Sequence, residues 1–174
     1  VDPYYLSWKA REFDFYTKFI ELAAEVNADM PEHVVRKVAA GLNLHGKALR
    51  GAHVLVLGVA FKRDIDDARN SPAQRVVELL LDSGAKVEYH DPHVPSFEVG
   101  GTVLHRPRVM LRSVPLAAGL ASADAVAIIT GHSTVDYDEV VATCGIVIDA
   151  VNVTSALAER NGRVIRLGAP MPAA

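Results

Sequence analysis

A short, unbroken apolar run at residues 53–58 constrains the fold of this chain more than any other feature of its sequence. The run reads HVLVLG, and a strand with this pattern is buried on both faces, as in a parallel sheet. Similar runs recur at 86–90, 125–129, 146–148 and 163–167. Helical patterns lie between them, so the sequence predicts an α/β fold with a doubly wound, mostly parallel, Rossmann-like sheet.

The helices of this sheet carry start and stop signals of their own. Ser71 followed by Pro72 is typical of a helix start, and Gly84 is typical of a helix end. A second helical pattern runs from Asp136 to Thr143. Residues 93–121 show no regular pattern, and we predict no element there.

Residues 1–50 contain no strand-like run and predict long helices ahead of the sheet. Their apolar residues form two adjoining helical stripes. The stripes are Phe15, Phe19, Leu22 and Val26, and beside them Phe13, Tyr16, Ile20 and Ala23. Thr17 is placed to cap this helix, and Asp29-Met30-Pro31-Glu32 predicts the start of a second helix that stops near Gly46. So wide an apolar arc requires burial on more than one side, either within its own domain or against another subunit.

Composition narrows the class of protein. Half of the 174 residues are apolar, which excludes a disordered tail, and 18 basic against 21 acidic residues give a net charge of −3. No run of Lys and Arg exceeds two residues, so neither nucleic acid nor a membrane surface is an expected partner. The sequence has no stretch long enough to span a membrane and no signal peptide, which predicts a cytoplasmic protein. Because it begins without Met, we expect it to be part of a longer protein.

Ligands of doubly wound sheets bind beyond the carboxyl ends of the strands, so the residues after each strand are the first candidates for a site. After the first strand only Gly58 is present of a G-x-G-x-x-G fingerprint, and we expect no NAD site in this domain. Lys62 follows, and the helix that starts at Ser71 is a place where anions bind. Lys62 is either a phosphate contact or a solvated loop lysine.

The same loop carries Asp64, Asp66 and Asp67. Three acids suit a divalent metal or the acidic pocket of a phosphate-receiver domain. The third strand, however, ends in Thr130-Gly131-His132 and offers no phosphoacceptor Asp. The sequence therefore favours local pairing of these acids with Lys62, Arg63 and Arg69.

Two further residue types attract attention without predicting a site. Cys144 has apolar neighbours and is expected to be a buried structural thiol with a raised pKa. His90 and His93 are spaced as a weak metal pair, which turn residues explain equally well. We predict no metal site.

Four stretches carry a resemblance to a known family. They are residues 1–12 (VDPYYLSWKARE), 19–23 (FIELA), 56–72 (VLGVAFKRDIDDARNSP) and 89–95 (YHDPHVP). They resemble the UDP-glucose/GDP-mannose dehydrogenase family, most closely its UDP-N-acetylhexosamine (UDP-N-acetylmannosamine/glucosamine) 6-dehydrogenase branch.

The resemblance implies an oxidoreductase that uses NAD to oxidise the C6 alcohol of a UDP-sugar to a carboxylate, in polysaccharide precursor synthesis. Residues 1–50 would then be the central dimerisation segment, forming a homodimer through the N-terminal helices, and residues 51–174 the UDP-sugar-binding domain. The NAD-binding domain and the nucleophilic cysteine of such enzymes would precede this sequence. The chain alone is therefore expected to be inactive.

The resemblance also assigns roles to single residues. Asp2 matches the acid beside the family's cysteine, and Phe61 and Lys62 match a Phe-Lys pair that contacts the UDP-sugar. Arg69 matches an arginine that reaches NAD held by the other domain. Val151 stands where the family usually has an arginine that binds the nucleotide-sugar, which predicts weaker binding. The alternative is a non-catalytic nucleotide-binding or scaffolding module, which includes a decayed paralogue. A receiver-like module is a distant third candidate.

Overall fold

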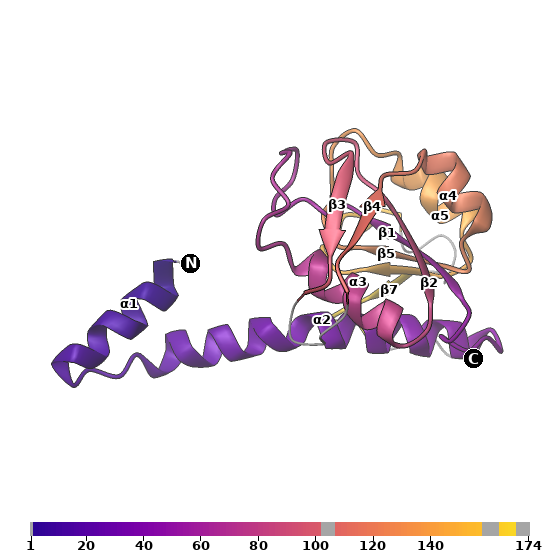
Figure 1. Ribbon diagram of the computed structural model, residues 1–174. Coiled ribbons are helices and arrows are strands. Elements are labelled where there is room, and N and C mark those ends of the chain that lie inside the picture. The colour runs from indigo at the N-terminus through magenta and orange to yellow at the C-terminus, as the bar shows by residue number, and fades with distance from the viewer. Residues whose placement is uncertain (1, 102–106, 158–163, 170–174) are drawn as a thin grey trace.

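The computed structural model describes residues 2–101, 107–157 and 164–169, and it contains one parallel sheet covered by helices (Figure 1). The helices are α1 (Asp2–Ala10), the 3-10 turn η1 (Arg11–Phe13), α2 (Lys18–Leu44), α3 (Pro72–Asp82), α4 (Leu116–Ser122) and α5 (Tyr137–Thr143). The strands are β1 (His53–Leu57), β2 (Lys86–His90), β3 (Ser96–Val99), β4 (Val109–Arg112), β5 (Ala125–Ile128), β6 (Val147–Asp149) and β7 (Val164–Arg166).

Five strands form the main sheet in the order β2-β1-β5-β6-β7, and every neighbouring pair in it is parallel. This confirms the predicted α/β fold, and each of the five predicted strand runs overlaps one of these strands. The segment without a predicted element holds an antiparallel hairpin, β3–β4, and the short helix α4. Sequence patterns missed the hairpin because β3 alternates exposed and buried residues and β4 is largely exposed, so neither is buried on both faces like the central strands.

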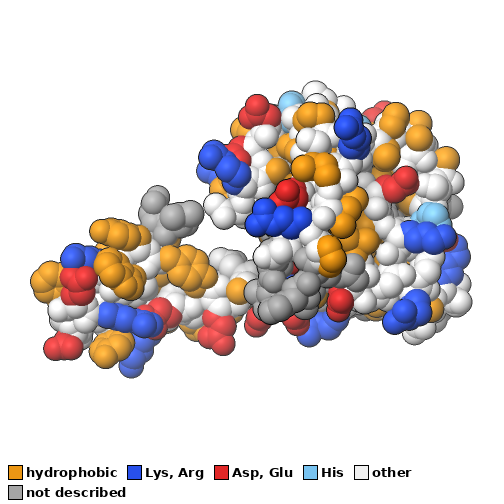
Figure 2. Space-filling view, viewed as in Figure 1, with side chains coloured by type: hydrophobic (Ala, Val, Ile, Leu, Met, Phe, Trp, Pro, Cys, Tyr) orange, Lys and Arg blue, Asp and Glu red, His pale blue; other side chains and the backbone are white. Residues whose placement is uncertain are grey.

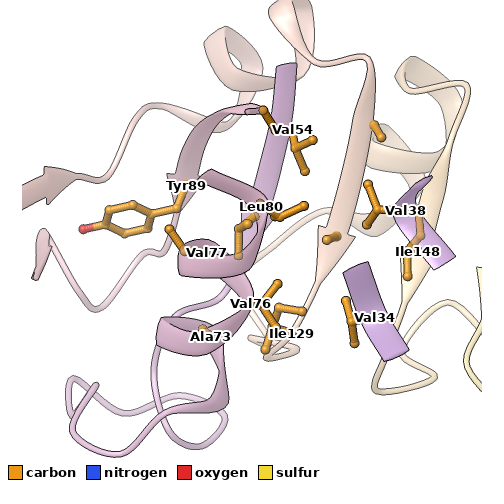
Figure 3. Close-up of a cluster of buried hydrophobic side chains, with 14 of the residues drawn as sticks. Val34, Val38, Val54, Ala73, Val76, Val77, Leu80, Tyr89, Ile129 and Ile148 are labelled. Atoms are coloured by element: carbon orange, nitrogen blue, oxygen red, sulfur yellow. The ribbon is translucent and has the colours of Figure 1, made fainter. Parts of the chain in front are cut away.

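Helices cover both faces of the sheet, which is why its central strands are apolar throughout. Val54 and Val56 of β1 face a core shared with α2 and α3, and Leu55 and Leu57 face a second core with α4 and α5. Figure 3 shows the first of these cores, where Val76 and Leu80 of α3 and Val38 of α2 meet the strands. The Ser71 hydroxyl caps α3 by accepting a hydrogen bond from the Ala73 amide, as predicted.

The expected start of a second helix at Asp29–Glu32 is wrong, because α2 runs unbroken from Lys18 to Leu44 with Pro31 inside it. The Asp29–Glu32 segment fits a helix start, but good helix formers stand on both sides of it. Proline removes only one backbone hydrogen bond, and Pro31 is buried. Val34, Val38 and Leu42 follow on one face and fix the second half of the helix on the sheet. The second half of α2 therefore packs in the same core as the strands, and the predicted boundary at residue 50 stays a prediction.

Residues 2–29, which we call the arm, comprise α1, η1 and the first part of α2. The arm extends beyond the α/β unit, with α1 folded back along α2 (Figure 1). Thr17 stands at the start of α2 as predicted, but its hydroxyl contacts that of Ser7 and does not cap the helix. Phe13, Phe15 and Tyr16 precede α2 and so do not belong to its stripes.

The apolar side chains of the arm are open to solvent. Phe19 is 88% exposed, and Figure 2 shows hydrophobic side chains gathered over this part of the molecule. The exposed set comprises Tyr4, Tyr5, Leu6, Trp8, Phe13, Phe15, Tyr16, Phe19, Leu22 and Val26. The described part of this chain therefore does not bury these residues. Among the described helices, none is both long and apolar enough to cross a membrane.

Candidate nucleotide site at the carboxyl ends of the strands

The strand order places a crevice between the ends of β1 and β5. The chain leaves β1 toward β2 on one side and continues from β5 toward β6 on the other, so the connections diverge at this point. A pocket of 490 Å³ lies here, within the size range of small-molecule sites. The loops after β1, β5 and β6 line it with Phe61, Lys62, Arg63, Ile129, Thr130, Gly131, Val151, Asn152 and Val153.

Gly58 brings the first two of these loops together. Its φ is +76°, and a Cβ atom at this position would lie 2.1 Å from the Thr130 carbonyl oxygen. The Thr130 hydroxyl then donates a hydrogen bond of 2.7 Å to the Ala60 carbonyl. Only glycine permits this approach of one backbone to the other.

Phe61 and Lys62 both line the pocket, as expected of ligand contacts. The Lys62 Nζ lies 5.8 Å from the centre of the Phe61 ring, within range of a cation–π interaction. Arg63, the other cation of the lining, pairs with Asp64 at 3.2 Å. In the parts of the chain that the structure describes, Lys62 has no ion pair, so its charge is available to a ligand.

Local pairing of the loop acids is confirmed for Asp64 and Asp67. Asp67 accepts hydrogen bonds from the Arg69 side chain and backbone, and these lower the pKa of its carboxyl group to about 2. Arg69 is mostly exposed and does not line the pocket. The start of α3 does not line it either, because Ser71 and Ala73 are buried against other residues.

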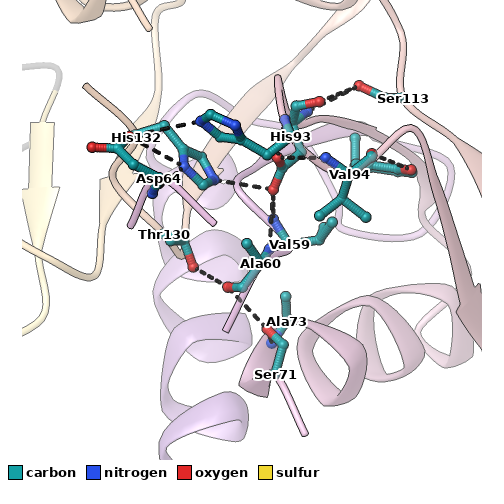
Figure 4. A network of polar contacts seen from close by, with 12 residues as sticks. Val59, Ala60, Asp64, Ser71, Ala73, His93, Val94, Ser113, Thr130 and His132 are labelled. Carbon is teal, nitrogen blue, oxygen red and sulfur yellow. Dashed lines mark hydrogen bonds and ion pairs between the residues drawn. The ribbon is translucent and has the colours of Figure 1, made fainter. Parts of the chain in front are cut away.

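A buried Asp–His pair lies directly behind the loop after β1 (Figure 4). The Asp91 carboxylate follows β2 and accepts hydrogen bonds from four backbone amides, those of Val59, Ala60, His93 and Val94. His132, from the loop after β5, approaches the same carboxylate at 3.1 Å through Nε2. Burial opposes the charge of Asp91, but the amides outweigh it and hold the pKa of the carboxyl below its ordinary value.

Three donor atoms near this pair lie close enough to be considered as metal ligands. Those of Asp64, His93 and His132 are all within 4.8 Å of one another. The His132 Nδ1, however, already accepts a hydrogen bond of 3.0 Å from the Asp64 backbone amide. His90, which the sequence spaces as a weak metal pair with His93, does not belong to this group, and its Nδ1 contacts the Val114 carbonyl at 2.8 Å.

The loop after β6 is shaped by a second buried carboxylate. Asp149 accepts hydrogen bonds from the backbone amides of Val151 and Thr154 and from the Thr154 hydroxyl. This turn carries Asn152 in a left-handed conformation, with φ of +59°. Val151 lies on the pocket wall with 46% of its surface exposed.

Two further residues singled out in the sequence are Asp2 and Cys144. Asp2 begins α1 on the arm, and its catalytic role stays a prediction. Cys144 is buried behind α5, and burial raises the pKa of its thiol above the ordinary value. This agrees with the prediction of a buried thiol with a raised pKa.

With this geometry known, comparison with other proteins decides the family. Residues 55–156, more than half of the chain, match the UDP-binding domain of the UDP-glucose/GDP-mannose dehydrogenase family. The chain belongs to this family. The matched range includes every loop that lines the pocket.

Individual relatives agree with the family assignment. The chain is 27% identical over 161 residues to the UDP-N-acetyl-D-mannosamine dehydrogenase of Methanococcus maripaludis, covering 88% of this chain and 34% of that protein. It is 31% identical over 148 residues to the corresponding Campylobacter jejuni enzyme, covering 83% and 34%. A solved NDP-N-acetyl-D-galactosaminuronic acid dehydrogenase of Methanosarcina mazei superposes with a TM-score of 0.66 at 30% identity, covering 84% of this chain and 30% of that one. The chain thus spans about a third of the length of these relatives.

The described loop after β1 lacks the glycine-rich fingerprint of a dinucleotide site. After β1 the chain reads Gly58-Val59-Ala60-Phe61, without the further glycines that let a dinucleotide pyrophosphate approach the helix start. Arg69, assigned to NAD by resemblance, is paired with Asp67. That assignment stays a prediction about a surface facing another domain.

Sequence reasoning found the β1 side of the pocket and missed most of the rest. Thr130, Gly131 and Val153 have no local signal, and Asp91 and His132 are separated by about forty residues of sequence. Each of them, however, follows a predicted strand at its carboxyl end. Placing those ends side by side in a parallel sheet would have brought these residues forward as candidates.

Proposed function

We propose that this chain binds the nucleotide of a UDP-sugar in the pocket at the ends of β1, β5 and β6. In this proposal it is the UDP-binding part of an NAD-dependent UDP-sugar 6-dehydrogenase, which oxidises the sugar C6 alcohol to a carboxylate. The observation that carries it is Lys62. An unpaired cation stands beside an aromatic ring in the pocket of a chain that belongs to a UDP-binding family.

The residues of the pocket wall suit a nucleoside diphosphate as the ligand. Lys62 supplies a positive charge for the pyrophosphate, while Phe61, Val151 and Val153 offer apolar surface for a flat base. Thr130 and Asn152 add polar groups that can orient the ligand. Which hexosamine such a ligand carries is left open by these contacts.

In the whole enzyme, the oxidation needs parts that the described residues do not supply. They contain no NAD fingerprint, and the thiol of Cys144 is buried, so we assign hydride acceptance and covalent catalysis to other segments. The inactivity of this chain by itself is part of the proposal. The same family resemblance implies an enzyme that works in the cytoplasm and serves the synthesis of polysaccharide precursors.

We also propose that the chain forms a homodimer through the arm. The arm exposes many large aromatic and aliphatic side chains, and extensive exposed apolar surface marks interaction sites. A groove of 430 Å³ between α1 and α2, lined in part by Trp8 and Ile20, adds shape to that surface. A second copy of the same surface would bury these side chains.

Binding of UDP-N-acetylglucosamine, followed by calorimetry or NMR titration, tests the nucleotide site. The Lys62→Ala variant should bind about tenfold more weakly than the wild type, because a hydrogen bond to a charged group is lost. Lys86→Ala is the matched control, since Lys86 is an exposed lysine at the opposite end of the sheet. Equal affinity of the two variants would place the ligand elsewhere.

The alternative of a non-catalytic nucleotide-binding module is favoured by one observation. Val151 offers no charge at a pocket position where the family usually has arginine. The two functions differ in the longer protein, since only a dehydrogenase will produce NADH from a UDP-sugar. Binding without turnover by the full-length protein would favour the module.

A further inference from the structure

His132 links the loop after β1, which lines the candidate nucleotide site, to the buried Asp91 carboxylate. Its side chain is fully buried, and both ring nitrogens have partners (Figure 4). Nε2 lies 3.1 Å from the Asp91 carboxylate, and Nδ1 lies 3.0 Å from the backbone nitrogen of Asp64. We call these two hydrogen bonds the His132 bridge.

The partners fix the protonation state of the ring. A backbone amide can only donate, so Nδ1 accepts from Asp64 and carries no proton. Nε2 therefore carries the proton and donates it to Asp91, which is held as a carboxylate by four backbone amides. His132 is thus neutral, in the Nε2–H form.

The bridge acts on the loop that carries Lys62. Asp64 lies two residues further along this loop, in a left-handed conformation with φ of +59°. Its own carboxylate accepts a hydrogen bond of 2.8 Å from the Ser133 amide, next to His132. Two reciprocal hydrogen bonds therefore fasten the loop after β1 to the loop after β5, and the position of Lys62 depends on them.

A metal ion at Asp64, His93 and His132 is the competing explanation for this cluster. His93 Nε2 is buried, has no hydrogen-bond partner among the described residues and lies 3.8 Å from the Asp64 carboxylate. A metal would need the Nδ1 lone pair of His132, which the Asp64 amide already occupies. The observed hydrogen bonds therefore favour a bridge between loops.

We propose that His132 is a positioning residue of the nucleotide site, which holds Lys62 in place for the ligand by accepting a hydrogen bond from the Asp64 amide. The proposal rests on the proposed function for its ligand and on the His132 bridge for its mechanism.

Two variants separate the halves of the bridge. In His132→Asn the amide oxygen takes the place of Nδ1 and can still accept from Asp64, whereas in His132→Gln the amide nitrogen takes the place of Nε2 and can still donate to Asp91. The asparagine variant should keep its affinity for UDP-N-acetylglucosamine within about threefold, and the glutamine variant should lose roughly tenfold, the worth of one good hydrogen bond. Equal losses would reduce His132 to a packing role and overturn the proposal.

The wild-type chain gives a second test that needs no variant. Nitrogen NMR of the imidazole should show an unprotonated Nδ1 at neutral pH, and the Asp64 amide should be protected from hydrogen exchange.

The other histidine beside the ring is controlled separately. The rings of His93 and His132 lie 4.9 Å apart, centre to centre. His93→Gln removes this neighbour and should leave the affinity for UDP-N-acetylglucosamine in place. A protonated Nδ1 at neutral pH, or stoichiometric Zn²⁺ binding that shifts both His93 and His132, would overturn the proposal. A chain that binds no UDP-sugar would overturn the proposed function alone, since the NMR and exchange measurements require no ligand.

Discussion

At the turn after β1, the Gly58 backbone passes so close to the Thr130 carbonyl that a methyl group cannot fit between them. Gly46 has a similar positive φ of +68° at the end of α2, but nothing lies within 4 Å of a Cβ placed there. The two glycines therefore separate two effects that usually occur together. One is the left-handed backbone, and the other is the close approach.

We predict that Gly58→Ala lowers the free energy of unfolding by about 3 kcal/mol or more, because both strain and a backbone clash are introduced. Gly46→Ala should cost only about 1–2 kcal/mol, the penalty of the left-handed conformation alone. Urea denaturation of the two variants measures the difference. Equal costs would mean that the approach to Thr130 is not needed for stability.

Val151 leads to a prediction about affinity. Val151→Arg adds an always-charged, forked donor to the pocket wall beside Lys62 and should strengthen UDP-sugar binding by about tenfold or more. Val109→Arg is the control, since Val109 is a similarly exposed valine on the hairpin. Calorimetry that finds no gain for Val151→Arg would mean that the pyrophosphate lies outside the reach of position 151.

At the scale of elements, the helix α2 shows what a local pattern can and cannot predict. The apolar spacing from Phe19 to Val26 predicted a helix, and Gly46 lies just beyond its end. The break expected at Pro31 did not occur, because packing of the following turns on the sheet overrides a local start signal. Helix type was thus predictable, and helix continuity depended on tertiary contacts.

The exposed half of α2 leads to a prediction about assembly. Phe19→Ser combined with Leu22→Ser removes two of the exposed apolar side chains, and each is worth roughly 1.5–3 kcal/mol when fully buried. Light scattering should show a dimer for the wild type and a shift toward monomer for this variant. Met110→Ser, an exposed apolar residue on β4, should leave the dimer intact. A monomeric wild type at high concentration would contradict the homodimer.

For the whole molecule, the Asp91 carboxylate predicts how stability depends on pH. Its pKa is lowered in the folded state, so its stabilising effect is complete above the unfolded value of about 3.9. That effect is lost as the pH falls through the lower, folded pKa. Asp91→Asn should therefore lower the free energy of unfolding at pH 7 by about 3 kcal/mol and flatten its decline in acid.

Urea denaturation at several pH values below 7 checks this prediction. Asp67→Asn serves as the control, because the Asp67 pKa is also lowered but its carboxylate faces solvent beside Arg69. A solvent-exposed ion pair contributes little to stability, so this variant should behave nearly as the wild type. Similar losses in both variants would show that burial of the Asp91 network is not what stabilises the fold.

The architecture as a whole was predictable because its central strands are continuous apolar runs such as 53–58. Strand order was not, since it depends on which strands pair in space. The residues of the site likewise divide into those that sequence position predicts and those that only the folded sheet brings together. Lys62 could be found from its position after a strand, whereas the Asp91–His132 contact joins residues that only the folded sheet brings together.

Because α2 is unbroken, it fixes the rotation of the arm about the helix axis relative to the pocket. At 27 residues it is about 40 Å long, and each residue turns the helix by about 100°. Because α2 is continuous, the direction in which the arm points its aromatic side chains is fixed relative to the direction in which the carboxyl ends of the strands face. One alanine inserted near residue 28 would swing the arm by more than a quarter turn, and a second copy held by the arm would then face a different side of the crevice.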